Sequence, residues 1–236
     1  MKLSLTTRAA TVVLTVVAMV AMTWAALTWY EKPRPAVTVG ANATRPGTGA
    51  AAIEIGGPFE LVAHTGETIS DAAFRGRFML VFFGYTFCPD VCPTELLVMS
   101  QALDLLGEKG EAVQPILITV DPERDTAEAL AEYVGNFHPR LIGLTGTEEQ
   151  IAAAAKAYRA FYAKAFYPAS GGTEDARDGQ TTEAQADDYL MNHSAFTYLM
   201  GPDGGYRTVF PHKTSPEDMA KAIAAELEKT HLATGG

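Results

Sequence analysis

The sequence contains very little cysteine. Its only two cysteines, Cys88 and Cys92, lie in one short loop of a 236-residue chain. A disulfide framework needs several cysteines spread along the chain, and an iron–sulfur cluster needs about four cysteine ligands. Both classes are therefore excluded. A metal site, a redox-active pair and a single local disulfide remain compatible with this pair.

The chain is also poor in positive charge. It has 18 Lys and Arg residues against 28 Asp and Glu residues, a net charge of −10 and a pI of about 4.9. Residues 1–30 hold two basic residues and no acidic one, so the remainder carries a charge of −12. Such an acidic body argues against nucleic acid as a partner. The hydrophobic fraction of 47% with 19% charged residues suits a globular protein with an attached apolar segment.

Charge is absent altogether from residues 9–30, which follow Lys2 and Arg8. As a helix rising about 1.5 Å per residue, this run would cross a hydrocarbon core about 30 Å thick. Three aromatic residues typical of a membrane interface stand at its far end: Trp24, Trp29 and Tyr30. A cleaved signal peptide is the competing interpretation, since Ala21 and Ala25 are small residues near a plausible cleavage point.

We favour the uncleaved anchor because the run is longer than a usual signal-peptide core. The predicted organisation is a cytoplasmic tail at 1–8, a transmembrane anchor at 9–30, a linker at 31–52 and a folded domain at 53–231. The linker is rich in Pro, Gly, Ala and Thr and has no sustained apolar period.

The two cysteines follow a continuous apolar run that ends at Gly84, as expected of a strand buried on both faces. Pro93 is well placed at the first position of a helix. The sequence therefore predicts that both sulfurs lie near the N-terminus of a helix, where a thiol pKa is lowered and thiolate is favoured. Tyr85 and Phe87 are predicted to pack within the loop.

Strands and helices alternate along the rest of the domain. This pattern predicts an α/β fold with a central mixed sheet and helices on both faces. Asp125 is the predicted N-cap of the second helix, and Thr147 with Gln150 has the signature of a capping box. The predicted strands are 59–63, 67–69, 77–84, 114–120, 141–144, 195–200 and 206–210, and the predicted helices cover 93–106, 126–137, 147–158 and 215–229. Residues 168–188 hold six acidic residues and one basic residue and are predicted to form an exposed excursion.

Two thiolates leave a protein metal site incomplete. Soft thiolates select copper(I) or zinc, and imidazole suits both metals. Among the five histidines His193 is the best placed, because it follows the acidic excursion and precedes a returning strand. Asp121 ends a strand at the same predicted edge of the sheet, as either a turn carboxylate or a charge near the sulfurs. Weaker candidates for thioether ligands are Met99, Met191 and Met200.

Three segments together resemble one known family. They read FGYTFCPDVCPT at 83–94, VDPERDT at 120–126, and YLMNHS at 189–194 followed by YLMGPDG at 198–204. In combination they are similar to the Sco/SenC family. The resemblance covers about residues 53–230 and implies a thioredoxin-like fold, tethered to the bacterial inner membrane and facing the periplasm.

The resemblance further implies that copper, as Cu(I) or Cu(II), is bound through Cys88, Cys92 and His193. It implies a role in assembling the dinuclear copper centre of cytochrome c oxidase, with a copper-donor protein and the copper-bearing oxidase subunit as partners. Asp121 matches an acidic position linked with metal handling or partner contact. The chain departs from the family at Asn192, where Asp is common, and in the length of the acidic excursion.

Other functions remain open at this point. A thiol–disulfide reductase would use Cys88 and Cys92 as a redox pair and would need no metal. A thiol peroxidase would need an activated thiolate with a nearby hydroxyl or arginine; Thr86 is available, but the sequence indicates no obvious arginine. A structural zinc site would have only three ligands in an open loop.

Overall fold

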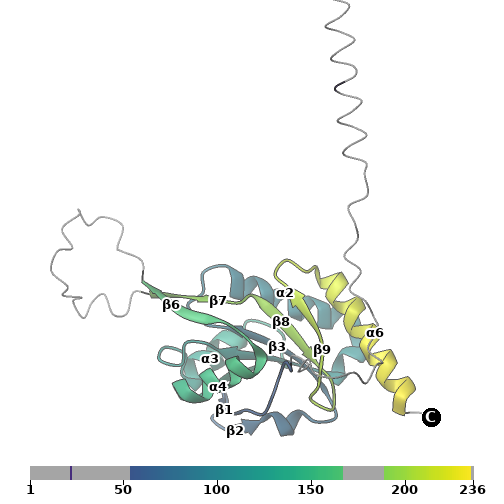
Figure 1. Cartoon of the computed structure of the whole chain (residues 1–236), viewed down its shortest axis with the longest axis horizontal. Helices are drawn as coiled ribbons and strands as arrows, with labels where there is room; N and C mark the ends of the chain where they lie inside the picture. The colour runs from purple at the N-terminus through teal and green to yellow at the C-terminus, as the bar shows by residue number, and fades with distance from the viewer. Residues whose placement is uncertain (1–21, 23–53, 167–188, 235–236) are drawn as a thin grey trace, which may run out of the picture. The chain divides into compact units, whose positions relative to one another are not determined.

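The structure is a computed structural model that describes Met22, residues 54–166 and residues 189–234 of the chain (Figure 1). Among these residues no helix is both long enough and apolar enough to cross a membrane. Apart from Met22, the predicted anchor lies outside the described residues, and so does the acidic excursion at 168–188.

Seven strands form the main sheet, in the order β2-β1-β5-β4-β3-β8-β9. Strands β3, β4 and β5 are parallel to one another, whereas β1, β8 and β9 pair antiparallel with their neighbours. The predicted mixed sheet is therefore confirmed. The strands are β1 (Glu60–Ala63), β2 (Thr68–Ser70), β3 (Phe78–Gly84), β4 (Val113–Thr119), β5 (Ile142–Thr145), β8 (Phe196–Met200) and β9 (Tyr206–Pro211).

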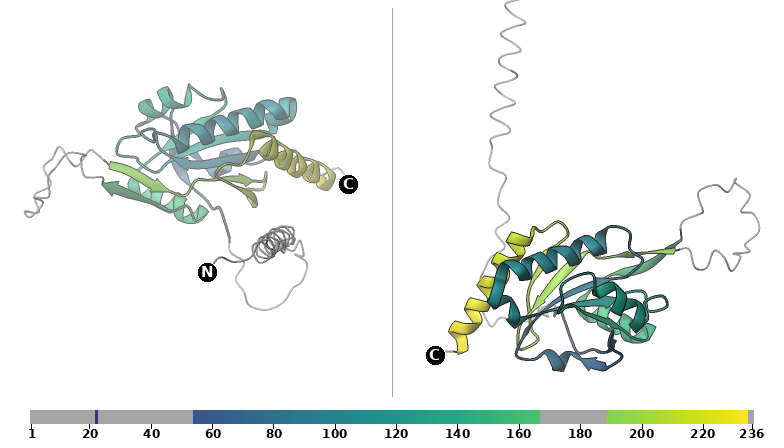
Figure 2. Two further views of the ribbon diagram at one scale, coloured as in Figure 1. Left: turned by 90° about the horizontal axis from the view of Figure 1, so that it is seen from above. Right: turned by 180° about the vertical axis from the view of Figure 1, so that it is seen from behind.

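Helices lie on both faces of this sheet (Figure 2). Helix α2 packs against α6, and α3 packs on β5. The helices are α2 (Val91–Leu106), α3 (Ala127–Val134), α4 (Glu148–Tyr158) and α6 (Pro216–Thr234), with short 3-10 turns η1 (Asp71–Phe74) and η2 (Gly107–Ala112).

The two central strands, β3 and β4, are mostly apolar, and every residue of both is buried. Side chains of β3 alternate between the two faces of the sheet. Phe83 packs against Tyr158 of α4. Phe82 points to the opposite face, where its ring lies near His193. This alternation places the functional residues and α4 on different sides of the sheet.

A second, two-stranded sheet was not predicted. It pairs β6 (Tyr162–Phe166) with β7 (Tyr189–His193), antiparallel, and His193 is the last residue of β7. In Figure 1 this ribbon extends away from the main sheet. The strand β7 leads through two residues into β8, which belongs to the main sheet.

Two helix starts differ from the prediction. Helix α2 begins at Val91, so Pro93 is its third residue and Cys92 lies within its first turn. Proline is tolerated there because the first four N–H groups of a helix have no partner inside the helix. Helix α3 is capped by Thr126, whose side chain accepts from the Ala129 N–H, and not by Asp125.

Other local predictions are confirmed. Thr147 and Gln150 form a complete capping box at the start of α4. Ser215 accepts a hydrogen bond from the Asp218 N–H at the start of α6. The hairpin predicted around Gly66 is β1–β2, with Gly66 at a φ of 86° that favours glycine.

Candidate metal centre

The site lies at the edge of the sheet where the parallel strands β3 and β4 end. Gly84 pairs with Thr119 at this edge, and the cysteine loop and Asp121 follow directly. Strand β8 is antiparallel to β3 and therefore starts at the same edge, where Thr197 pairs with Phe82. This topology brings the connection after His193 beside the cysteine loop.

Cys88 acts as the cap of helix α2. The side chain of Asp90, the N-cap residue, makes no capping hydrogen bond. Instead the Cys92 N–H, in the first turn, donates to Cys88 Sγ at 3.3 Å. An unpaired N–H at a helix N-terminus stabilises an anion, so this contact favours the thiolate form of Cys88.

Cys92 is fully buried, whereas Cys88 is half-buried. Gly84 leaves the space that Cys92 occupies: a Cβ at position 84 would lie 3.0 Å from Cys92 Sγ and 2.7 Å from a ring carbon of Phe82. The glycine that ends β3 is therefore required by the close approach of the sulfur.

His193 reaches the sulfurs from β7. Its Nε2 lies 3.3 Å from Cys92 Sγ, and its Nδ1 lies 3.3 Å from the carbonyl oxygen of Ser194. When Nδ1 carries the proton and donates to that carbonyl, Nε2 presents a lone pair toward the sulfurs. The rings of Phe82 and Tyr85 each meet the imidazole edge to face at a centroid distance of 5.8 Å and hold its orientation.

The structure thus brings together the three predicted ligand residues, of which Cys88 and His193 are 105 residues apart in the sequence. Cys88 Sγ, Cys92 Sγ and a ring nitrogen of His193 all lie within 4.8 Å of one another. Among the described residues this is the one group of three donors that could hold a metal ion. Two of the donor residues, Cys88 and His193, line a cavity of about 230 Å³, which Met191 also lines.

The other candidates lie outside this group. His64 accepts from the Gly143 N–H, His138 accepts from the Arg140 N–H, and His212 pairs with Glu95. The side chain of His231 is not described. All three candidate methionines are buried, and of the three only Met191 lines the cavity.

The two thiols differ sharply in acidity. A hydrogen bond from the Cys92 thiol, together with contacts to His193 and the Cys92 N–H, lowers the pKa of Cys88 to about 3 against the opposing effect of burial. Burial, and next the Cys88 sulfur beside it, raises the pKa of Cys92. Without metal the pair is therefore one thiolate and one thiol. Binding of a metal to both sulfurs releases the proton of Cys92.

This difference predicts the pH dependence of alkylation. Thiolate is the reactive form, so the rate of Cys88 with iodoacetamide should stay nearly constant between about pH 5 and pH 8 and fall only below about pH 4. Initial rates followed by mass spectrometry measure it. In urea-unfolded protein the same rate should rise about tenfold per pH unit up to about pH 8. A comparable rise in the folded protein contradicts the assignment.

Asp125, the predicted helix cap, instead forms hydrogen bonds with the start of the cysteine loop. Its carboxylate accepts from the Thr86 N–H at 3.0 Å, the Thr86 hydroxyl at 2.5 Å and the Thr119 hydroxyl at 2.6 Å. The residue is fully buried, and burial raises its pKa while these hydrogen bonds oppose the rise. Asp125 therefore ties the loop before Cys88 to the end of β4.

Asp121 is also buried rather than presented at the surface. Its carboxylate accepts from Arg124 Nε and from the Tyr189 hydroxyl, each at 2.6 Å. Burial, followed by the bond to Asp121, raises the pKa of Tyr189. The predicted contribution of Asp121 to metal handling or partner contact stays a prediction. Tyr85 is buried as predicted, but Phe87 is 58% exposed and its predicted packing within the loop is wrong.

The donor set restricts the metals that fit. Two sulfurs and one imidazole suit soft or borderline ions such as Cu(I) and Zn(II) and suit poorly the hard ions that prefer oxygen. Closed structural zinc sites have four protein ligands, and this group has three beside an open cavity. The arrangement therefore fits a metal that enters and leaves.

Comparisons with known proteins identify relatives of this chain. A sequence model of the family SCO1/SenC matches residues 47–228. Protein SenC of Rhodobacter capsulatus is 41% identical over 186 residues, covering 79% of this chain and 76% of that protein. Protein sco1 of Schizosaccharomyces pombe is 39% identical over 173 residues, covering 73% and 60%. The human mitochondrial SCO1 homologue is 39% identical over 175 residues, and the match spans about half (53%) of its length.

Solved structures show the same fold. ScoI of Arabidopsis thaliana with copper bound is 34% identical, with a TM-score of 0.64, covering 74% of this chain and 99% of that one. ScoI of Bradyrhizobium japonicum with copper bound is 38% identical, with a TM-score of 0.59, covering 74% and 98%. The predicted thioredoxin-like fold with a mixed central sheet is confirmed.

Proposed function

Because the chain belongs to the SCO1/SenC family, we propose that it is a copper-binding metallochaperone that assists assembly of the dinuclear copper centre of cytochrome c oxidase. The observation that carries the proposal is the convergence of Cys88 Sγ, Cys92 Sγ and His193 within 4.8 Å. Two copper-bound relatives that share the fold support copper as the metal.

The chemistry of the three donors suits delivery of Cu(I). Two thiolates and a neutral imidazole around Cu(I) carry a net charge of −1 and leave the ion with few ligands. Cys88 is half-buried beside the open cavity, so a thiolate of another protein can approach the ion from that side. Such an approach exchanges one sulfur for another without releasing free copper.

We further propose the predicted location. The charge-free run at 9–30 would anchor the chain in the bacterial inner membrane, with the copper-binding domain in the periplasm. This placement would bring the cysteine pair to a compartment in which disulfides form.

A thiol–disulfide reductase acting on the oxidase is the second candidate function. The observation in its favour is the reactive Cys88 thiolate next to a second thiol, since a thiolate attacks a disulfide and a neighbouring thiol then resolves the mixed disulfide. The same pair would then serve as electron donor, and the protein would leave the reaction with Cys88 and Cys92 oxidised.

Transfer to the oxidase subunit tests both functions. The full-length protein, reduced and loaded with Cu(I) under anaerobic conditions, should retain one copper ion per chain through gel filtration. When it is mixed with the metal-free, reduced copper-bearing subunit, copper should move to that subunit. If the protein retains no copper but reduces the oxidised subunit, the reductase function replaces the proposed one.

A further inference from the structure

One short segment, residues 121–125 between β4 and α3, contacts both parts of the chain that carry the predicted ligands. Asp125 holds the cysteine loop through Thr86, as described above. Arg124 reaches both the cysteine loop and β7. We propose that Arg124 is a positioning residue of the metal centre, which fixes β7, and with it His193, against the cysteine loop. The proposal rests on the copper site proposed above.

Arg124 contacts β7 at Tyr189, the first residue of the strand that ends at His193. Its Nη1 donates to the Tyr189 carbonyl oxygen at 3.0 Å. Its guanidinium carbon lies 3.7 Å from the centre of the Tyr189 ring, well within the range of a cation–π interaction. Arg124 therefore holds both the backbone and the side chain of Tyr189.

The same guanidinium touches the cysteine loop. Its central carbon lies 4.6 Å from the centre of the Phe87 ring, and Phe87 directly precedes Cys88. Phe87 is 58% exposed, so the ring is only partly enclosed by the protein. The stacked guanidinium is thus a direct link between the residue next to Cys88 and the strand that carries His193.

Asp121 holds the Arg124 guanidinium in place from the protein interior. Arg124 Nε donates to Asp121 Oδ2 at 2.6 Å, and the Asp121 side chain is fully buried. The Tyr189 hydroxyl donates to the other carboxylate oxygen of Asp121 at 2.6 Å. A planar guanidinium can make these bonds and stack at the same time, which a lysine ammonium cannot.

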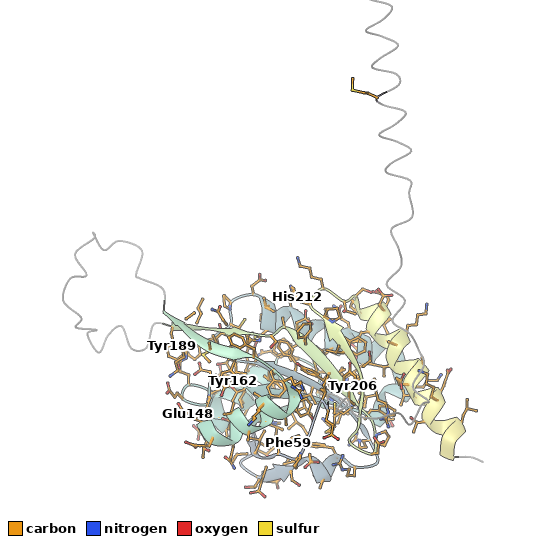
Figure 3. The ribbon with its side chains drawn as sticks, viewed as in Figure 1. Phe59, Glu148, Tyr162, Tyr189, Tyr206 and His212 are labelled. Carbon is orange, nitrogen blue, oxygen red and sulfur yellow. The ribbon has the colours of Figure 1, made fainter. Side chains whose placement is uncertain are left out.

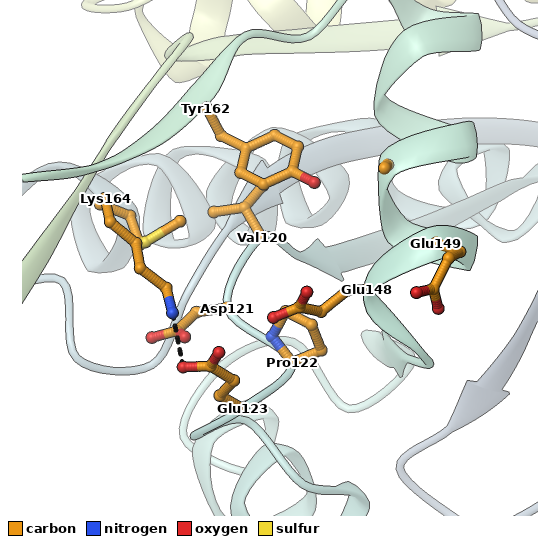
Figure 4. Close-up of a pocket in the computed structure, with 10 residues that line it drawn as sticks. Val120, Asp121, Pro122, Glu123, Glu148, Glu149, Tyr162 and Lys164 are labelled. Carbon is orange, nitrogen blue, oxygen red and sulfur yellow. Dashed lines mark hydrogen bonds and ion pairs between the residues drawn. The ribbon is translucent and has the colours of Figure 1, made fainter. Parts of the chain in front are cut away.

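A second and more exposed set of contacts lies around Arg124 and Asp121. Lys164 of β6 pairs with Glu123 at 2.6 Å, and Figure 4 shows this pair beside Asp121. The Tyr189 hydroxyl also lies 3.2 Å from Glu123, and Figure 3 shows Tyr189 at the ribbon that leaves the main body. Exposed ion pairs contribute little free energy, so the buried contacts of Arg124 carry the positioning.

The position of β7 depends on such contacts. An isolated two-stranded ribbon is marginally stable in water, and β7 pairs along its length only with β6 among the described strands. Its His193 end is joined to β8 through two residues. Its Tyr189 end is held by Arg124 and Asp121. Between the two ends Met191 is buried in the core, so loss of the attachment at Tyr189 would let the strand pivot about Met191 and shift the imidazole relative to the sulfurs.

A double-mutant cycle separates this role from general stabilisation. Cu(I) affinity is measured on the full-length protein by competition with a chromogenic chelator, for the wild type, Arg124→Met, His193→Ala and the double variant. Arg124→Met should weaken Cu(I) binding by about 10- to 100-fold, the usual effect of removing a residue that orients a metal ligand. In the His193→Ala protein the same substitution should change the affinity by less than about twofold, because energies couple when one residue acts through another.

Two further variants sharpen the comparison. Arg124→Lys keeps the charge beside Asp121 and loses the planar stacking, so its affinity should lie between those of the wild type and Arg124→Met. Arg207→Met is the control for removal of an arginine from an ion pair away from the site, since Arg207 pairs with the more exposed Asp203 beyond the opposite end of β8. It should leave the Cu(I) affinity unchanged. In metal-free protein, Arg124→Met should also speed amide hydrogen exchange of β7 relative to this control.

The outcomes are distinguishable. Wild-type protein that binds no Cu(I) refutes the proposed function. If the wild type binds Cu(I) and Arg124→Met has the same affinity, the positioning role is overturned. It is also overturned if Arg124→Met lowers the affinity by the same factor in the wild type and in His193→Ala. Unchanged exchange in β7 overturns it as well. If Arg124→Met does not fold, Arg124→Lys enters the same cycle under the same criteria.

Discussion

Replacing Cys92 by serine is expected to lower the Cu(I) affinity by about 1000-fold. Structural zinc sites gain about 10–16 kcal/mol from four ligands, or about 2.5–4 kcal/mol per ligand. Each 1.4 kcal/mol is a factor of about ten, so loss of a thiolate at the upper end of this range gives about 1000-fold. A serine hydroxyl is a hard donor that does not replace a thiolate on Cu(I). Competition with a chromogenic chelator under anaerobic conditions measures the loss.

The substitution should also change the remaining cysteine. The Cys92 thiol is the first cause of the low pKa of Cys88, so Cys88 in the variant should titrate at higher pH and react more slowly with iodoacetamide at neutral pH. This second effect needs no metal. It therefore shows whether the two sulfurs interact in the free protein as the structure indicates.

Met99→Leu is the matched control for Cys92→Ser. Met99 is a buried sulfur-containing residue on the same helix and lies in the core. A volume-conserving exchange of this kind usually costs less than about 1.5 kcal/mol of stability, and the Cu(I) affinity should not change. Cys92→Ser protein that binds Cu(I) as tightly as Met99→Leu would place the metal elsewhere.

Local sequence signals predicted much of the fold. The buried strands β3 and β4, the capping box of α4 and the turn of the β8–β9 hairpin each depend on residues close together in the chain. The hydrophobic pattern, cap residues and turn glycines report such structure directly. Their agreement with the observed sheet explains why the mixed α/β architecture could be predicted.

The errors in the helix starts come from side-chain contacts that the usual capping preferences do not include. Asp125 and Thr126 are both good helix caps, and the choice between them is made by Thr86 and Thr119, which draw the Asp125 carboxylate away from the helix. Helix α2 starts two residues early because Cys88 Sγ accepts the Cys92 N–H. The contact between Asp125 and Thr86 spans 39 residues and leaves no signal beside the helix. The contact of Cys88 is local, but cysteine is not among the residues that usually cap helices.

The residues of the candidate site were likewise predicted only in part. The cysteine pair could be predicted from its place between a buried strand and a helix, and His193 from its position and from the family resemblance. The role of β7 could not, because its partner strand β6 lies across the predicted excursion. Arg124 was missed since its aromatic contacts, Phe87 and Tyr189, are 37 and 65 residues away in sequence. Its position one residue before Asp125 was the only local hint.

Replacing His193 by alanine is expected to separate metal delivery from thiol chemistry. Loss of one of three ligands should weaken Cu(I) binding by about 100- to 1000-fold, on the scale of about 2.5–4 kcal/mol per ligand. His193 is a secondary cause of the low Cys88 pKa, after Cys92. The rate of thiol–disulfide exchange with a small disulfide should therefore stay within about tenfold of the wild type.

His64→Ala is the matched control, because His64 is half-buried between β1 and β2 at the far edge of the sheet and does not belong to the sulfur group. It should leave both the Cu(I) affinity and the exchange rate unchanged. In a strain that depends on this protein, His193→Ala should then abolish oxidase assembly if copper delivery is the function. Normal assembly with His193→Ala, together with failure of assembly with Cys88→Ser, would instead identify disulfide reduction as the required activity, since only that reaction needs the sulfurs without the imidazole.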